Sequence, residues 1–327
     1  MKKHRVVVAG KVHELVIGRI QDSCDIAYFD SPRSIAKDVL REALRDAEGL
    51  FSTGAIRVDD DLLRDSPKLR VVSQSSVGYD NVDVDALTRR GIPFGNTPGV
   101  LVEATADLTF GLVLCAARRI HEGFQLVTSG DWYRGTELSF GVDLFGKTMG
   151  IVGLGSIGKA VARRAQAAGM QVLYHNRHVR DDEEELKVSY RPFSELLSES
   201  DFVVVLVPLS DESRGMFGDE EFSRMKKTAY FINAARGLIV DTMALYRALR
   251  DGKIAYAALD VTDPEPIPPD HPLFETQNIL ITPHIGSATH ETRASMARLA
   301  VDNLLAGLEK KPLTTCVNES VNYRGTP

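Results

Sequence analysis

Three residues far apart in the sequence carry the side chains that an acid-assisted reaction on a carbonyl group needs. They are Arg236 in the segment NAARG, Glu265 between two prolines, and His284 in the segment PHIGS. A guanidinium can bind a carboxylate, an imidazolium can protonate a carbonyl oxygen, and a carboxylate can hold that imidazole in one tautomer. The combination therefore predicts a site for a substrate with both a carboxylate and a carbonyl.

Each of these residues also has a plain structural interpretation. An Arg after a strand is commonly a surface charge, a single His is commonly structural, and a Glu between prolines can decorate a turn. All three, however, directly follow apolar runs that read as strands. Because parallel strands bind ligands at their carboxyl ends, these side chains are expected to share one edge of a sheet.

Two sets of short apolar runs alternate with helical patterns along the chain, which is typical of βαβ units. The first set begins at Val6, Ile26, Leu50, Val71 and Ile92. Its last run suits a sheet edge, because Pro93 cannot donate a hydrogen bond to a neighbouring strand. The second set has six runs, beginning at Thr148, Val172, Val203, Tyr230, Ala257 and Ile279. We therefore predict an α/β fold of two domains, each a parallel sheet flanked by helices.

A glycine motif, GxGxxG, follows the first run of the second set. It comprises Gly153, Leu154, Gly155, Ser156, Ile157 and Gly158. Such glycines permit a tight turn, a close approach of the backbone to a pyrophosphate, and close helix packing. The motif alone is weak and can be a simple strand-to-helix turn, but its position between a strand and a helix predicts a dinucleotide site. With a dinucleotide as hydride donor, Arg236, Glu265 and His284 predict reduction of a small 2-keto acid.

The residue that decides between NAD and NADP is expected about 20 residues after the motif, where NAD-binding proteins have an acidic side chain. This chain has Asn176 there, followed by Arg177 and His178. Asn176 removes a charge that would repel a 2′-phosphate, while Arg177, with His178 or Arg180, could pair with one. NADPH is the predicted cofactor, with NADH possible. In the alternative interpretation these residues form a solvated basic loop and the protein accepts both cofactors.

The order of these elements predicts the domain boundaries. Residues 1–100 with 290–327 form a substrate (flavodoxin-like) domain, and residues 101–289 form the NAD(P)-binding Rossmann domain. Within the latter, 102–119 reads as one long helix and the glycine-rich segment 120–147 as an irregular arm. A helix over about 289–309 returns the chain to the first domain.

Composition limits the partners. The formal charge of −6 comes without a basic stripe or tail, which argues against nucleic acid. Three cysteines, far apart and without CxxC spacing, indicate neither disulfides nor a zinc site, so no metal is predicted. Because no signal-like segment or bilayer-length apolar run is found, we expect a cytoplasmic protein.

Over essentially its whole length the chain resembles the D-isomer-specific 2-hydroxyacid dehydrogenases, and within them the bacterial glyoxylate/hydroxypyruvate reductases, also called 2-ketogluconate reductases. The segments that carry the resemblance are SVGYDN at 76–81, the glycine motif, NAARG at 233–237, DPEP at 263–266 and PHIGSAT at 283–289. The substrates implied are glyoxylate, hydroxypyruvate and 2-ketogluconate, which the sequence does not rank.

The resemblance also implies roles for single residues. His284 would be the proton donor, Glu265 its partner, and Arg236 the clamp on the substrate carboxylate and keto oxygen. Val77 and Gly78 would offer backbone amides to that carboxylate. Four further residues would border the cofactor: Thr105, Ala234, Asp260 and Gly286.

In similar reductases the arm embraces a second subunit, so the resemblance implies a homodimer with Trp132 beside the partner's active site. Trp132 can equally anchor the arm within one subunit. Two rival functions are compatible with the same Arg, Glu and His. One is another family member, such as a D-lactate or phosphite dehydrogenase; the other is a dinucleotide-sensing protein like the corepressors that share this fold.

Overall fold

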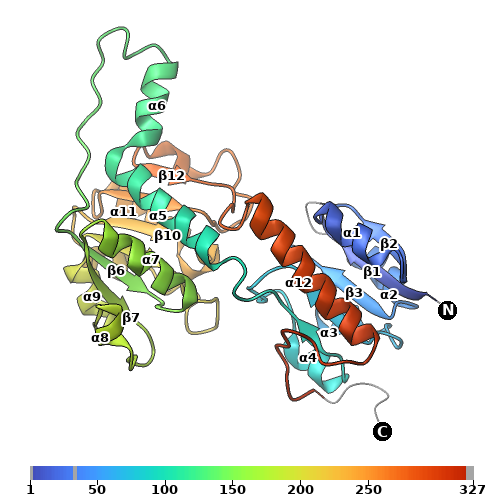
Figure 1. Cartoon of the computed structure of the whole chain (residues 1–327). Coiled ribbons are helices and arrows are strands. Elements are labelled where there is room, and N and C mark those ends of the chain that lie inside the picture. The colour runs from blue at the N-terminus through green and yellow to red at the C-terminus, as the bar shows by residue number, and fades with distance from the viewer. Residues whose placement is uncertain (1–2, 32–34, 322–327) are drawn as a thin grey trace. The chain divides into compact units, whose positions relative to one another are not determined.

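The computed structural model describes residues 3–31 and 35–321. The chain divides into two compact units, residues 1–101 with 288–327 and residues 102–287. Each unit contains a parallel sheet with helices on both faces (Figure 1). The prediction of an α/β fold with two helix-flanked parallel sheets is confirmed.

The first unit has a five-stranded sheet in the order β2-β1-β3-β4-β5, which is the order of flavodoxin-like sheets. Its strands are β1 (His4–Ala9), β2 (Cys24–Phe29), β3 (Gly49–Ser52), β4 (Val71–Gln74) and β5 (Phe94–Gly95). Its helices are α1 (Glu14–Ile20), α2 (Lys37–Leu44), α3 (Asp60–Leu63), α4 (Val84–Arg89) and α12 (His290–Leu308). Alternate residues of β1 pack on opposite faces: Val6 and Val8 with α1 and α12, Val7 and Ala9 with α2 and α3. A strand buried on both faces reads as the unbroken apolar run that the sequence shows.

The second unit has a seven-stranded sheet in the order β12-β11-β10-β9-β6-β7-β8, which extends the Rossmann order by one strand. Its strands are β6 (Thr148–Val152), β7 (Gln171–His175), β8 (Ser189–Tyr190), β9 (Phe202–Val205), β10 (Tyr230–Asn233), β11 (Tyr256–Leu259) and β12 (Ile279–Ile281). Its α-helices are α5 (Val102–Arg118), α6 (Ile120–Thr128), α7 (Ser156–Ala167), α8 (Glu183–Leu186), α9 (Phe193–Glu199), α10 (Asp219–Arg224) and α11 (Thr242–Arg250). Short 3₁₀ helices span Gly237–Ile239 and Pro272–Glu275.

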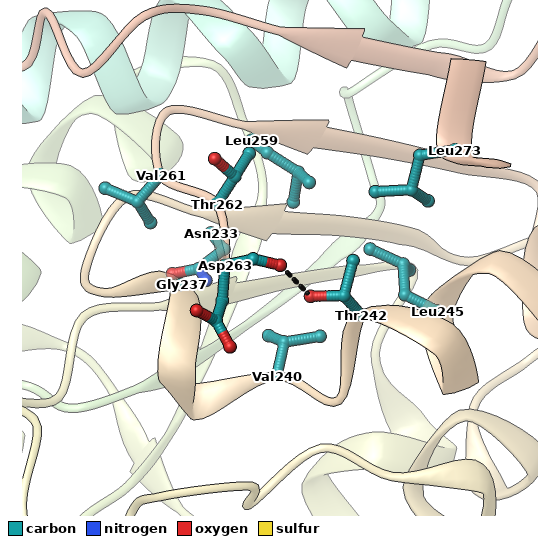
Figure 2. Close-up of a pocket in the computed structure, with 10 residues that line it drawn as sticks. All are labelled: Asn233, Gly237, Val240, Thr242, Leu245, Leu259, Val261, Thr262, Asp263 and Leu273. Carbon is teal, nitrogen blue, oxygen red and sulfur yellow. Dashed lines mark hydrogen bonds between the residues drawn. The ribbon is translucent and has the colours of Figure 1, made fainter. Parts of the chain in front are cut away.

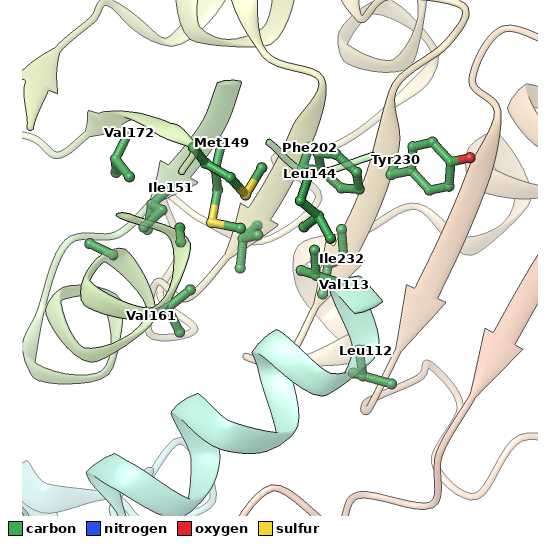
Figure 3. Packing of buried hydrophobic residues seen from close by; sticks show 14 of the residues in the cluster. Leu112, Val113, Leu144, Met149, Ile151, Val161, Val172, Phe202, Tyr230 and Ile232 are labelled. Carbon is green, nitrogen blue, oxygen red and sulfur yellow. The ribbon is translucent and has the colours of Figure 1, made fainter. Parts of the chain in front are cut away.

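The core on one face of this sheet fixes the start of α7 against β6. Figure 3 shows Met149 and Ile151 of β6 packed with Val113 of α5 and Val161 of α7, all fully buried. Burying one such side chain contributes roughly 1.5–3 kcal/mol. The turn that joins β6 to α7 is therefore held at both of its ends by packed side chains.

Two sequence-based predictions need correction. The second sheet has a seventh strand, β8, paired with β7; two residues are too few to show a strand periodicity. The expected irregular arm also begins with a helix, α6, because Arg119 adopts a left-handed conformation (φ 53°) that ends α5 and lets a new helix start. Ile120, Phe124 and Val127 have helical spacing, but the glycines around them hid that pattern.

Candidate active site

The strand order of the second sheet reverses at β6, whose neighbours are β7 and β9. Ligands of open α/β sheets bind at the carboxyl ends of the strands at such a reversal. Gly153, the first residue after β6, has φ +103°, and an added Cβ would lie 2.7 Å from the Val207 amide nitrogen. Only glycine therefore lets the chain turn from β6 into the loop at this point.

The other two glycines of the motif shape the start of α7. An added Cβ at Gly158 would lie 2.4 Å from the carbonyl oxygen of Gly153, so the helix packs directly on the loop. At Gly155 nothing lies within 4 Å of an added Cβ. Open space thus precedes the first amides of α7, those of Ser156 and Ile157, whose N–H groups have no acceptor within the helix. This arrangement fits a pyrophosphate.

Asn176 follows β7 and is tied to the glycine loop. Its side-chain oxygen accepts a hydrogen bond from the Leu154 amide at 2.7 Å. An amide side chain in this orientation leaves its NH₂ group as the polar end directed away from Leu154. The position therefore presents no negative charge to the ribose end of a dinucleotide.

Arg177, His178 and Arg180, the basic residues predicted beside the cofactor, differ in their surroundings. Arg180 donates to both carboxylate oxygens of Asp182, at 2.6 and 2.7 Å. Arg177 pairs with Glu212 at 3.2 Å, and their side chains are 78% and 70% exposed. His178 is exposed. Since an exposed pair is held weakly and a bidentate pair more firmly, Arg177 is better able than Arg180 to turn to a phosphate.

Arg236 is positioned by a buried amide. Asn233, the last residue of β10, accepts from the Ala235 amide at 3.0 Å and donates to the Arg236 carbonyl at 2.9 Å. The half-buried guanidinium of Arg236 donates to the carbonyl oxygen of Ala235 at 2.8 Å. The turn that carries Arg236 is therefore fixed from inside the sheet.

Gly237 brings the Arg236 turn against the loop that carries Glu265. An added Cβ at Gly237 would lie 1.9 Å from the Thr262 carbonyl oxygen. The Thr242 hydroxyl donates to the Asp263 carbonyl at 2.9 Å, and both segments surround a cavity of about 10 Å³ (Figure 2). A cavity of this size holds about one water molecule. Two loops that follow different strands are thus joined by backbone contact.

His284 and Glu265 form the pair that the sequence predicted. The His284 Nδ1 lies 2.6 Å from Glu265 Oε1, and the Thr262 amide donates to Glu265 Oε2 at 3.3 Å. Burial raises the pKa of Glu265, but the hydrogen bond and charge of His284, the Thr262 amide and the Arg236 charge outweigh it and leave that pKa below its ordinary value. An ionised Glu265 can only accept a hydrogen bond, so the His284 Nδ1 carries a proton toward it and Nε2 points away from it.

The backbone of His284 is in the left-handed region, with φ 54°. Such a conformation is uncommon for a residue other than glycine and is kept only where neighbours impose it. Asp260, buried at the end of β11, accepts from the amides of Ile285 and Gly286, both at 2.8 Å, and from the Thr282 hydroxyl at 2.7 Å. These three bonds hold both sides of His284.

The remaining cofactor residues predicted in this unit lie at the same sheet edge. An added Cβ at Gly286 would lie 3.2 Å from Asp260 Oδ2 and 3.4 Å from Thr105 Cγ2, so these three residues are neighbours. Ala234 directly follows β10, and its amide donates to the Val205 carbonyl at 3.4 Å. Val77 and Gly78 belong to the other unit, in the half-exposed loop after β4.

Sequence reasoning assigned no role to several residues that build this site. Asn233, Gly237, Thr262 and Thr282 support Arg236, Glu265 or His284 through contacts that the sequence does not show. The available signal was a polar residue or glycine at the end of an apolar run. In the described part of the chain, no group of three or more His, Cys, Asp or Glu is placed to hold a metal ion, and no helix is long and apolar enough to cross a membrane.

Comparison with known proteins identifies the second unit directly. Residues 110–286, more than half of the chain, match the family described as "D-isomer specific 2-hydroxyacid dehydrogenase, NAD binding domain". A glyoxylate reductase of Korarchaeum cryptofilum (strain OPF8) is 44% identical over 322 residues, which cover 98% of this chain and 97% of that protein.

Solved structures agree over nearly the whole chain. A protein of Thermus thermophilus is 41% identical with a TM-score of 0.89, covering 96% of this chain and 99% of that one. An NADPH-dependent glyoxylate/hydroxypyruvate reductase of Sinorhizobium meliloti, in complex with NADP and malonate, is 32% identical with a TM-score of 0.90, and the whole of both chains is covered.

These likenesses, together with the glycine loop, make the protein an oxidoreductase with a nicotinamide dinucleotide as its cofactor. The chain belongs to the D-isomer-specific 2-hydroxyacid dehydrogenase family.

Proposed function

We propose that the protein reduces small 2-keto acids, namely glyoxylate, hydroxypyruvate and 2-ketogluconate, to D-2-hydroxy acids with NADPH. The single observation that carries this proposal is the pairing of His284 Nδ1 with Glu265 Oε1 at 2.6 Å. The loop that carries Glu265 lies against the Arg236 turn. An acid held in one tautomer close to a cation suits a substrate with adjacent carbonyl and carboxylate groups.

Each catalytic residue has a distinct role in this proposal. His284 donates its Nε2 proton to the keto oxygen, because Glu265 occupies the Nδ1 side. Glu265 accepts from Nδ1 and holds the ring with Nε2 directed away from it, before and after the transfer. Arg236 binds the carboxylate and polarises the keto oxygen, and the amides of Val77 and Gly78 donate to the carboxylate.

The bound dinucleotide supplies the hydride. Gly153, Gly155 and Gly158, with the amides of Ser156 and Ile157, would hold its pyrophosphate. Near the nicotinamide we place Thr105, Ala234, Asp260 and Gly286.

The preference for NADPH over NADH rests on the segment after β7. Asn176 is uncharged, and Arg177 has only an exposed partner. A 2′-phosphate with two negative charges can recruit such an arginine. His178, exposed beside it, is a second donor, whereas Arg180 is already bound by Asp182.

We also propose that the first unit is the substrate domain, the second the Rossmann domain, and that the protein is a homodimer. Among the described residues α6 has no buried side chain, and Phe124 and Trp132 are 66% and 67% exposed. Exposed apolar residues gathered on one arm favour burial against a second copy. Sedimentation showing only monomer would contradict the dimer.

The function is tested by initial rates of NADPH and NADH oxidation with each of the three keto acids, for the wild type and for His284→Ala. Turnover that is faster with NADPH and lost in the variant is expected. Absence of turnover with every substrate would refute the proposal and favour a dinucleotide-sensing protein, and turnover only with other substrates, such as pyruvate, would favour another member of the family.

A further inference from the structure

A fully buried amide side chain lies directly below the loop that contains Val77 and Gly78. Gln74 is the last residue of β4, which lies between β3 and β5 in the sheet, and its exposed fraction is 0%. Burying an amide without hydrogen bonds is costly, so its partners show what the residue does.

Gln74 and Asn81 form a reciprocal pair of amides across the base of the loop. Asn81 Nδ2 donates to Gln74 Oε1 at 2.8 Å, and Gln74 Nε2 lies 3.2 Å from Asn81 Oδ1. Asn81 Nδ2 also donates to the Ile56 carbonyl at 2.5 Å. The two ends of the segment 74–81 are therefore closed by side chains rather than by a backbone ladder.

The same amide holds the top of the loop. Gln74 Nε2 lies 2.6 Å from the Ser76 hydroxyl and 2.9 Å from the Gly78 carbonyl oxygen, to which that hydroxyl also donates at 2.6 Å. The Val77 carbonyl accepts from Asn96 Nδ2 at 2.9 Å. Both carbonyls are thus engaged by side chains.

The backbone amides of Val77 and Gly78 remain open to a ligand. Within residues 3–31 and 35–321, neither the Val77 nor the Gly78 N–H has a protein acceptor. Consecutive N–H groups left free on a loop whose carbonyls are tied to the protein can form a site for an anion. The Gly78 N–H shares its peptide with the Val77 carbonyl, which Asn96 holds, and the Val77 N–H shares its peptide with the Ser76 carbonyl, which the Thr97 amide holds at 2.9 Å. Gln74 and the Ser76 hydroxyl hold the next peptide, through the Gly78 carbonyl.

We propose that Gln74 is a positioning residue for the substrate carboxylate: through the Ser76 hydroxyl and the Gly78 carbonyl it fixes the loop on both sides of the Val77 and Gly78 amides. This inference rests on the proposed function. Gln74 touches no reacting atom; it acts through the backbone that does.

The test compares two variants that each remove a buried amide of the same unit without changing its volume much. Gln74→Met removes the network. Asn318→Leu is the matched control, because Asn318 is 6% exposed and bonds to the Phe94 amide, the Thr88 hydroxyl and the Ile92 carbonyl, none of which is in the loop. For each protein we would measure kcat and KM for glyoxylate, the Ki of oxalate as an unreactive carboxylate, and the Kd of NADPH.

For Gln74→Met we expect KM and Ki to rise by about 10- to 100-fold, the effect of displacing a binding group by about 1 Å, with the Kd of NADPH unchanged. Asn318→Leu should keep all three constants despite a comparable loss of thermal stability. If Gln74→Met does not fold, Ser76→Ala should raise the same KM and Ki to a smaller extent. The inference would be overturned if Gln74→Met, or Ser76→Ala in its place, had the same KM and Ki as Asn318→Leu.

A wild type that reduces no keto acid refutes the proposed function without deciding this inference. Calorimetric titration with oxalate then decides it: binding that Gln74→Met weakens and Asn318→Leu retains supports the positioning role. Binding that is absent, or is the same in both variants, overturns it.

Discussion

Replacing Glu265 with Gln should move the pH dependence of the reaction while leaving the site assembled. In the wild type the His284 Nδ1 lies 2.6 Å from Glu265 Oε1. A Gln side chain keeps an oxygen that can accept from this Nδ1, but it removes the negative charge. That charge stabilises the protonated imidazole, which reduction requires. Reduction by Glu265→Gln should therefore fade at a lower pH than reduction by the wild type.

The size of the effect follows from the separation and exposure of the pair. Two unit charges about 4 Å apart interact by about 1 kcal/mol in water and about 4 kcal/mol near a protein surface. Since the His284 and Glu265 side chains are 45% and 41% exposed, the value lies near the lower end, at about 1–2 kcal/mol. About 1.4 kcal/mol corresponds to a factor of ten in rate, so kcat/KM for reduction should fall about tenfold on the basic side of the profile.

The assay is kcat/KM for glyoxylate as a function of pH, which reports the ionisation of the free enzyme. Oxidation of the hydroxy acid needs the neutral imidazole, so the acidic limb of its profile should also move to lower pH. Glu275→Gln is the control, because Glu275 is exposed and accepts only from the Tyr246 hydroxyl in the contacts described, at 3.0 Å. An unchanged profile in Glu265→Gln, or an equal shift in Glu275→Gln, would refute the pairing as the source of the acid's protonation.

Three further substitutions test other parts of the structure. Gly237→Ala should cost at least about 3 kcal/mol of unfolding free energy and most of the activity, because the new Cβ would lie 1.9 Å from the Thr262 carbonyl oxygen. Gly111→Ala is the control: nothing lies within 4 Å of its added Cβ, so it should be neutral or stabilising. Equal melting temperatures for the two variants would contradict the contact. Glu212→Gln should tighten NADPH binding by up to about fivefold and leave NADH binding unchanged, because it frees Arg177. The control is Glu199→Gln, since the exposed Glu199 pairs with Arg191 at 3.0 Å. An equal change for both cofactors would argue against competition between Glu212 and the 2′-phosphate for Arg177. Asp201→Asn should lose about 1–2 kcal/mol of unfolding free energy at pH 7. Burial raises the pKa of Asp201, but the Thr148 amide and Lys226, each at 2.9 Å, hold that pKa below the ordinary value of 3.8. The stability advantage of the wild type in denaturant unfolding should therefore persist above pH 3.8 and vanish as the pH falls below it. An advantage that survives in acid would contradict this role of Asp201.

Residues close together in the sequence made much of the fold predictable. Unbroken apolar runs such as Val6–Val8 indicate strands buried on both faces, and GxGxxG after such a run indicates the turn into α7. The residues of an edge pair as short as β8, and the restart of a helix after Arg119, carry too little local signal. Their conformations depend on neighbours that the local sequence does not contain.

By itself, the sequence determined which chemical groups are present and which strand ends carry them. Only the tertiary structure decided their partners: that Asp182 binds Arg180 and Glu212 binds Arg177, that Gly237 lies against Thr262, and that Gln74 supports the loop after β4. Hydrogen bonds and close contacts act over about 3 Å, whereas the loops that make them are joined by whole strands and helices. Which groups come within that distance depends on how those elements pack, and no local pattern in the sequence specifies it.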